Sequence, residues 1–138
     1  MAETPPRATS PVTPYLSIRD ARGQEAVAFY AKAFGAEEIF RTLADDGKRL
    51  LHSHLRILGC SVMLSDDFPE YRGGAPAPEP AGTTIHLAVE DADPVWNAAV
   101  AAGATVTMPL ADQFWGDRFG NLHDPFGHSW SIASPVKK

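Results

Sequence analysis

The chain has 138 residues, of which 44% are hydrophobic and 21% are charged, and these values are ordinary for one globular domain. Its formal net charge of -5 argues against a nucleic-acid-binding surface, which needs clustered Lys and Arg. No apolar run is long enough to span a bilayer, and the single cysteine, Cys60, excludes an intrachain disulfide and a thiolate zinc site. We therefore expect no nucleic-acid partner, no membrane partner and a cytoplasmic location.

The first half of the chain predicts a strand, a helix and three further strands. Residues 1–12, rich in Pro, Thr and Ser, are expected to form a flexible N-terminal arm, and a strand follows over 13–19. Residues 24–34 carry apolar side chains at helical spacing, and Gly35 suits the end of a helix. Strands are expected over 37–43, 48–57 and 60–65, with turns at 45–47 and 58–59.

The same order of elements is expected again in the second half. Residues 67–82, rich in Pro and Gly, form a linker or an ordered surface loop. A strand over 83–89 precedes a helix, for which Asp93 is the expected N-cap and Pro94 the first helical residue, and which stops at Gly103. Three strands follow, over 104–109, 117–124 and 128–133. The gapless match of AVAFYAKAFGA, from Ala26, to PVWNAAVAAGA, from Pro94, supports a duplication.

The predicted fold class is therefore α+β, with two tandem βαβββ units over residues 13–66 and 83–134 inside a single domain of residues 13–138. Each unit covers one face of its sheet with the helix and leaves the other face exposed. Two such units together would make a curved eight-stranded mixed sheet around a central pocket, and a ligand is expected in that pocket.

Four segments carry a resemblance to a known family: PYLSIRDARGQEAVAFYAKAFGAEE, HSHLRILGCSVMLSD, TIHLAVEDAD and MPLADQFWGDRFGNLHDPFGHSWSI. Through them the chain, from about Thr13 to Ser134, resembles the vicinal oxygen chelate superfamily of glyoxalases, bleomycin-resistance proteins and dioxygenases. Within that superfamily it is most similar to the PhnB-like branch. The resemblance implies a homodimer. It does not choose a chemistry, because the superfamily includes isomerases, ring-cleaving dioxygenases, epoxide-opening thiol transferases and non-catalytic antibiotic-binding proteins.

The resemblance also provides a test for metal binding. In metal-dependent members, four strand residues, usually His, Glu or Gln, hold one divalent ion that acts as a Lewis acid. The last-strand ligands map onto Met63 and Ser131, neither of which replaces a carboxylate on a hard divalent ion. The first-strand positions are Thr84 or His86 in the second unit, and Thr13 or Tyr15 in the first. The usual ligand set is therefore absent, and no cofactor is expected.

Three histidines need a separate interpretation. His52 and His54 lie two residues apart on a strand, so they share a face and are expected to face the pocket. Together with His86 they could form a shifted site for Mn, Fe, Ni or Zn. They could equally be polar residues that hydrogen-bond their neighbours.

Three other side chains also have two interpretations. Trp115 could stack on a flat ligand or cover the edge of the sheet. Arg118 could bind a carboxylate or phosphonate, or pair with Asp117 or Asp124. Tyr15 could contact a ligand or pack in the core.

We thus predict a protein that binds a small organic molecule. The expected ligand-binding residues are Tyr15, His52, His54, His86, Trp115, Arg118 and Ser131. The alternative is a divalent-metal-dependent lyase, isomerase or dioxygenase that uses His52, His54 and His86. A regulatory domain that acts through a dimer face is a third hypothesis. No catalytic residue is predicted.

Overall fold

The structure, a computed structural model, describes residues 4–137 of the chain. The first three residues of the predicted arm, and Lys138 at the end of the predicted domain, lie outside the described residues. The chain forms two compact units, Met1–Ala31 with Gly35–Pro78, and Lys32–Phe34 with Glu79–Lys138.

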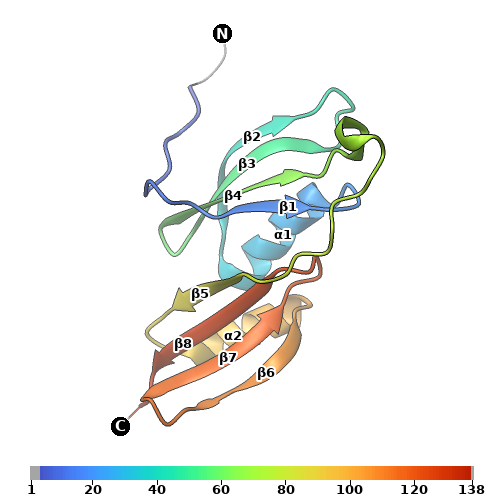
Figure 1. Cartoon of the computed structure of the whole chain (residues 1–138). Coiled ribbons are helices and arrows are strands. Elements are labelled where there is room, and N and C mark those ends of the chain that lie inside the picture. Colours follow the sequence, from blue (N-terminus) through green and yellow to red (C-terminus); the bar gives the residue numbers. More distant parts are fainter. Residues whose placement is uncertain (1–3, 138) are drawn as a thin grey trace. The chain divides into compact units, whose positions relative to one another are not determined.

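The first unit contains four strands and a long helix up to Ala31 (Figure 1). The elements are β1 (Tyr15–Ile18), α1 (Gly23–Phe34), β2 (Glu37–Leu43), β3 (Leu50–Ile57) and β4 (Cys60–Asp66). The sheet order is β1-β4-β3-β2, in which β1 pairs with β4 in parallel and the other pairs are antiparallel. The short helix η1 (Pro69–Arg72) lies in the Pro- and Gly-rich stretch that follows.

The second unit repeats this order. It consists of β5 (Thr84–Ala88), α2 (Ala92–Ala102), β6 (Thr105–Asp112), β7 (Asp117–His123) and β8 (Ser129–Pro135), with the sheet order β5-β8-β7-β6. The predicted α+β fold with two βαβββ units is confirmed, and the eight strands form two four-stranded mixed sheets.

Helical periodicity and glycine geometry explain where α1 forms and stops. Its apolar positions Ala26, Tyr30 and Ala33 are buried, as the helical spacing requires. Gly35 then adopts a left-handed conformation, φ 68°, and its N–H donates to the Ala31 carbonyl, which closes the helix.

The start of α1 is held by a side chain from the far end of the unit. Asp66, the last residue of β4, is 2% exposed and accepts hydrogen bonds from the N–H of Gly23 at 2.7 Å and of Leu50 at 2.6 Å. A Cβ atom at Gly23 would lie 2.3 Å from an Asp66 carboxylate oxygen, so a glycine is needed there. Burial raises the pKa of Asp66, against the opposing effect of the two N–H donors.

The second unit uses the same device, and it corrects one prediction. Ser134, near the end of β8, accepts a hydrogen bond from the N–H of Ala92, the first residue of α2, at 3.0 Å. The predicted N-cap at Asp93 is therefore wrong: the N-cap position is Asp91, and Asp93 lies within the first helical turn. Local sequence favoured Asp93, but a hydroxyl from β8 satisfies the helix start.

Two smaller observations complete the fold. No helix among residues 4–137 is long and apolar enough to cross a membrane. Cys60 is exposed at the start of β4.

Candidate functional site

Side chains alternate along each strand between the helix side of its sheet and the opposite face, which we call the helix-free face. In-register pairing aligns one row of four side chains across each helix-free face. In the first unit the row is Tyr15, Met63, His54 and Phe40. In the second unit it is His86, Ser131, Asn121 and Met108. The two rows occupy corresponding strands of the two units.

This register decides which first-strand residues correspond to the metal ligands of metal-dependent superfamily members. Tyr15 lies opposite Met63 and His86 lies opposite Ser131, so the four positions hold a phenol, a thioether, an imidazole and a hydroxyl. This set has no carboxylate and does not fit a hard divalent ion. Within residues 4–137, no three His, Cys, Asp or Glu side chains are grouped so that they could hold a metal ion.

In the first unit, Tyr15 and His52 form a surface pair. The Tyr15 hydroxyl and His52 Nδ1 are 2.9 Å apart, and the two rings lie 5.8 Å apart between centroids. Burial raises the pKa of Tyr15. Burial also lowers the pKa of His52, and electrostatic repulsion from the neighbouring His54 lowers it further. Both groups are therefore held in their neutral forms near pH 7.

His54 is fully buried, so it does not offer a ring to an open pocket as expected. Its Nε2 atom lies 2.8 Å from the Ser61 hydroxyl. Ser61 is bound in turn by Thr9, through two backbone-to-hydroxyl hydrogen bonds of 2.9 Å. His54 Nδ1 is buried and has no hydrogen-bond partner among the described residues. This histidine thus belongs to the interior of the first unit.

In the second unit, His86 lies directly opposite Ser131. His86 Nδ1 lies 2.7 Å from the Ser131 hydroxyl, and the exposed His86 ring stacks on Phe119, with the planes 24° apart and the centroids 6.0 Å apart. Beside Ser131 lies Asn121, whose Oδ1 atom is buried and has no hydrogen-bond partner within residues 4–137. Sequence analysis missed Phe119 and Asn121, although their alternation along β7 was a usable signal.

Aromatic rings continue from His86 along the helix-free face of the second unit. Trp115 packs edge-on against Phe119 at 5.7 Å, and Phe114 packs edge-on against Trp115 at 5.1 Å. Trp115 is 49% exposed and Phe114 is 98% exposed. We call Phe114, Trp115, Phe119 and His86 the aromatic ladder. It presents a π surface on which a planar group can stack.

A depression of about 420 Å³ adjoins the aromatic ladder. Its floor includes Ala88 and Ala133, which are paired across β5 and β8 and leave room because their side chains are small. His86 belongs to both the depression and the ladder. Glu90 and Asp117 give its rim an acidic character. The depression and the ladder together form a candidate ligand site.

Arg118 lies on the other side of this sheet and does not join the candidate site. Its guanidinium binds Asp93, at 3.0 to 3.3 Å, and Asp112, at 3.1 Å. Of the two interpretations of Arg118, the structure shows an ion pair within the chain, but its partners are Asp93 and Asp112 instead of Asp117 or Asp124. The two carboxylates raise the pKa of Arg118, and Arg118 lowers the pKa of Asp93. Arg118 ties β7 to the first turn of α2.

These observations define a class: α+β proteins built from two βαβββ units, each with a row of four aligned side chains on its helix-free face. The family model for the glyoxalase/bleomycin resistance protein/dioxygenase superfamily matches residues 13–132, and the chain belongs to this superfamily.

Relatives support the assignment. An uncharacterized protein of Mycobacterium bovis, Mb0911c, is 47% identical over 131 residues, which cover 92% of this chain and 84% of the relative. The crystal structure of PA1353 from Pseudomonas aeruginosa has 26% identity and a TM-score of 0.72, covering 91% of this chain and 98% of that one. A PhnB protein from Bacillus cereus has 19% identity and a TM-score of 0.69, covering 91% of this chain and 99% of that one, and has the same fold.

Proposed function

We propose that this protein binds a small organic molecule with a flat aromatic group on the helix-free face of its second unit, without the usual four-residue metal site. The observation that carries the proposal is the aromatic ladder beside the alanine-floored depression. Stacking aromatic side chains and a few converging polar groups are the usual composition of ligand pockets.

Each residue has a distinct task in this proposal. Trp115 and Phe119 offer ring faces and edges to the planar group of the ligand. The hydrogen bond between His86 Nδ1 and Ser131 fixes the histidine ring, so its Nε2 atom is directed to one place for a polar group of the ligand. The buried Asn121 Oδ1 atom, which lacks a partner in the described part of the chain, adds a hydrogen-bond acceptor to the same row.

Tryptophan fluorescence tests the proposal directly. Of the three tryptophans, Trp96 and Trp130 are buried and Trp115 is half exposed, so a ligand on the ladder changes the emission of Trp115. A library of planar aromatic compounds is first screened by thermal shift, and hits are then titrated by fluorescence. We expect a saturable change in the parent protein and its loss in Trp115→Phe, with Tyr71→Phe as a control because Tyr71 is an exposed aromatic of the first unit. If the best hits bind Trp115→Ala as tightly as the parent, the proposal fails.

The metal-dependent alternative is tested on the same protein. Elemental analysis after dialysis against Mn, Fe, Ni or Zn measures retained metal per chain. Near one ion per chain, lost in His52→Ala and His86→Ala, would support the three-histidine site and contradict metal-free binding.

We also propose a homodimer, which rests on the superfamily resemblance. Light scattering coupled to size exclusion at micromolar concentration should give twice the mass of the 14.9 kDa chain. A monomer mass would refute it.

A further inference from the structure

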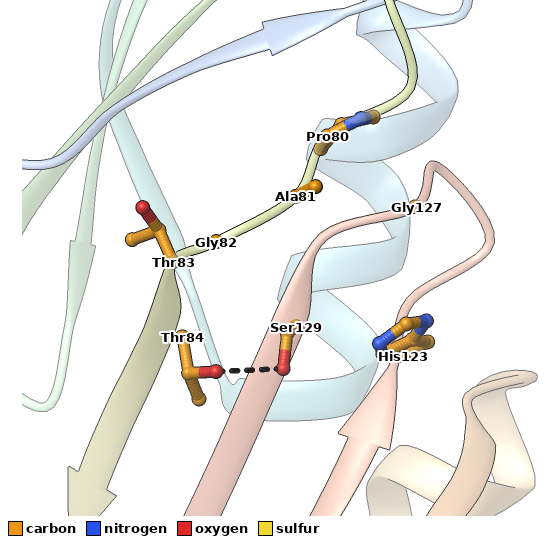
Figure 2. A pocket seen from close by; sticks show the side chains of 8 residues that line it. All are labelled: Pro80, Ala81, Gly82, Thr83, Thr84, His123, Gly127 and Ser129. Carbon is orange, nitrogen blue, oxygen red and sulfur yellow. Dashed lines mark hydrogen bonds between the residues drawn. The ribbon is translucent and has the colours of Figure 1, made fainter.

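A second cavity, of about 320 Å³, lies at the other end of the helix-free face of the second unit (Figure 2). It is lined by the segment 80–83 that leads into β5, and by side chains from β5, β7 and β8. Two of its walls are Gly82 and Gly127, whose φ angles of 81° and 93° suit glycine and whose missing side chains keep the cavity wide. Neither the proposed ligand site nor the superfamily comparison assigns a role to this cavity.

Hydrogen-bond donors converge on this cavity. The Thr84 and Ser129 hydroxyl oxygens are 2.9 Å apart (Figure 2). One hydroxyl proton lies between them, so the proton of the accepting hydroxyl remains available to a ligand. His123 is paired with Ser129 across β7 and β8, is exposed, and has no hydrogen-bond partner for its ring among the described residues. Its ring carries an N–H donor in either tautomer.

The charges of the residues that line the second cavity indicate what kind of ligand it can bind. The depression beside the aromatic ladder has Glu90 and Asp117 on its rim, whereas the second cavity has no acidic side chain among its lining residues. An anion is therefore not repelled at close range, even in a chain of net charge -5. The lining also has no Lys or Arg, and these are the residues that usually bind doubly charged phosphate groups. The cavity therefore offers hydroxyl and imidazole hydrogen-bond donors but no Lys or Arg side chain, and this combination favours a singly charged carboxylate over a phosphate.

We propose that the cavity at Thr84, Ser129 and His123 binds the carboxylate of the ligand. This inference rests on the proposed function, because the same ligand places its aromatic group on the ladder. Phe119 and His123 are four residues apart on β7, so the two ends of the ligand lie about 13 Å apart. The row of His86, Ser131 and Asn121 lies between them. The ligand class is thus an elongated aromatic monocarboxylic acid.

Calorimetric titration of matched probes tests the inference. The probes are 9-phenylnonanoate, its amide 9-phenylnonanamide, and inorganic phosphate. The variants are the double variant Thr84→Val with Ser129→Ala, and the control Thr105→Val, which removes a hydroxyl from the same cross-strand row on the edge strand β6 but outside the cavity. Circular dichroism and an unfolding curve confirm that each variant is folded, and the single variant Ser129→Ala replaces the double variant if that one is unstable.

In the parent protein and in Thr105→Val we expect the acid to bind at least tenfold more tightly than the amide. In the double variant this preference should fall below threefold, because the charge-assisted hydrogen bonds are lost. Equal binding of acid and amide by the parent protein, no binding of the acid, or tighter binding of phosphate than of the acid would each overturn the carboxylate inference. If the acid binds Trp115→Ala as tightly as the parent protein while still being preferred over the amide, the aromatic part of the proposed function is overturned and the carboxylate cavity stays in place.

Discussion

Replacement of Asp124 by Asn tests how the turn between β7 and β8 is held. Asp124 is 5% exposed and accepts hydrogen bonds from both backbone and side-chain donors. Its Oδ1 atom receives the N–H groups of Phe126 and His128, at 2.9 and 3.0 Å, and its Oδ2 atom receives Nε1–H of Trp130 at 2.9 Å. An asparagine has the same shape but one acceptor oxygen. Since two backbone donors hold that oxygen, the amide nitrogen faces the indole N–H.

The expected cost follows from this geometry. A hydrogen bond to a charged group contributes about 1.5–3 kcal/mol, and two donors left facing each other in a buried site add to the loss. Part of this loss of stability is offset, because a neutral asparagine costs less to bury than a charged aspartate. We expect Asp124→Asn to lower the free energy of unfolding by about 2–4 kcal/mol. Urea denaturation followed by circular dichroism at pH 7 measures this as a lower midpoint with an unchanged slope.

A double-mutant cycle provides the control. Trp130→Phe removes the indole N–H, so Asp124→Asn should cost at least about 1 kcal/mol less in that background than in the parent protein. Strict additivity of the two substitutions would show that the bond from Trp130 to Asp124 does not stabilise the turn, and would refute the reasoning.

Two further predictions concern packing and pH. Gly120→Ala places a Cβ atom 2.6 Å from the Trp96 ring, so we expect about 1–3 kcal/mol of destabilisation in the same urea assay, and a neutral result would contradict the packing of α2 on β7. Arg49 lowers the pKa of Asp46 and of Glu70 to about 2, from ordinary values of 3.8 and 4.5, so their stabilising effect is present above pH 4.5 and disappears as the pH falls towards 2. Arg49→Gln should therefore have a shallower loss of stability than the parent between pH 5 and 2, and identical pH profiles would refute this.

Elements fixed by local patterns could be predicted from the sequence. Residues 37–43 were expected as a strand and form β2 with the same bounds, and the helix expected over 24–34 differs from α1 by one residue at its start. These segments have clear periodicity and end at turn residues, so no distant contact was needed to place them.

Features that depend on distant partners could not be predicted. The burial of His54 depends on its contact with Ser61, and the two bonds that join Ser61 to Thr9 span 52 residues. Arg118 binds Asp93, which is 25 residues away, and sequence reasoning considered only near neighbours.

Strand register limited the prediction of the site in a different way. Thr84 and His86 share a face, so alternation could not show which of them lies opposite Ser131. The hydrogen-bonded register of β5 and β8 supplies that answer. Alternation along β7 could have indicated Phe119, but its ring contact with Trp115 required the structure.

The most direct test of metal-free aromatic binding is a fluorescence titration of Trp115 with the best aromatic ligand, performed on protein treated with a chelator and on protein supplied with Mn or Zn. Metal-free binding predicts the same dissociation constant in both samples and no ligand-induced change of emission in Trp115→Phe. Binding that disappears with the chelator and returns with the metal would contradict metal-free binding.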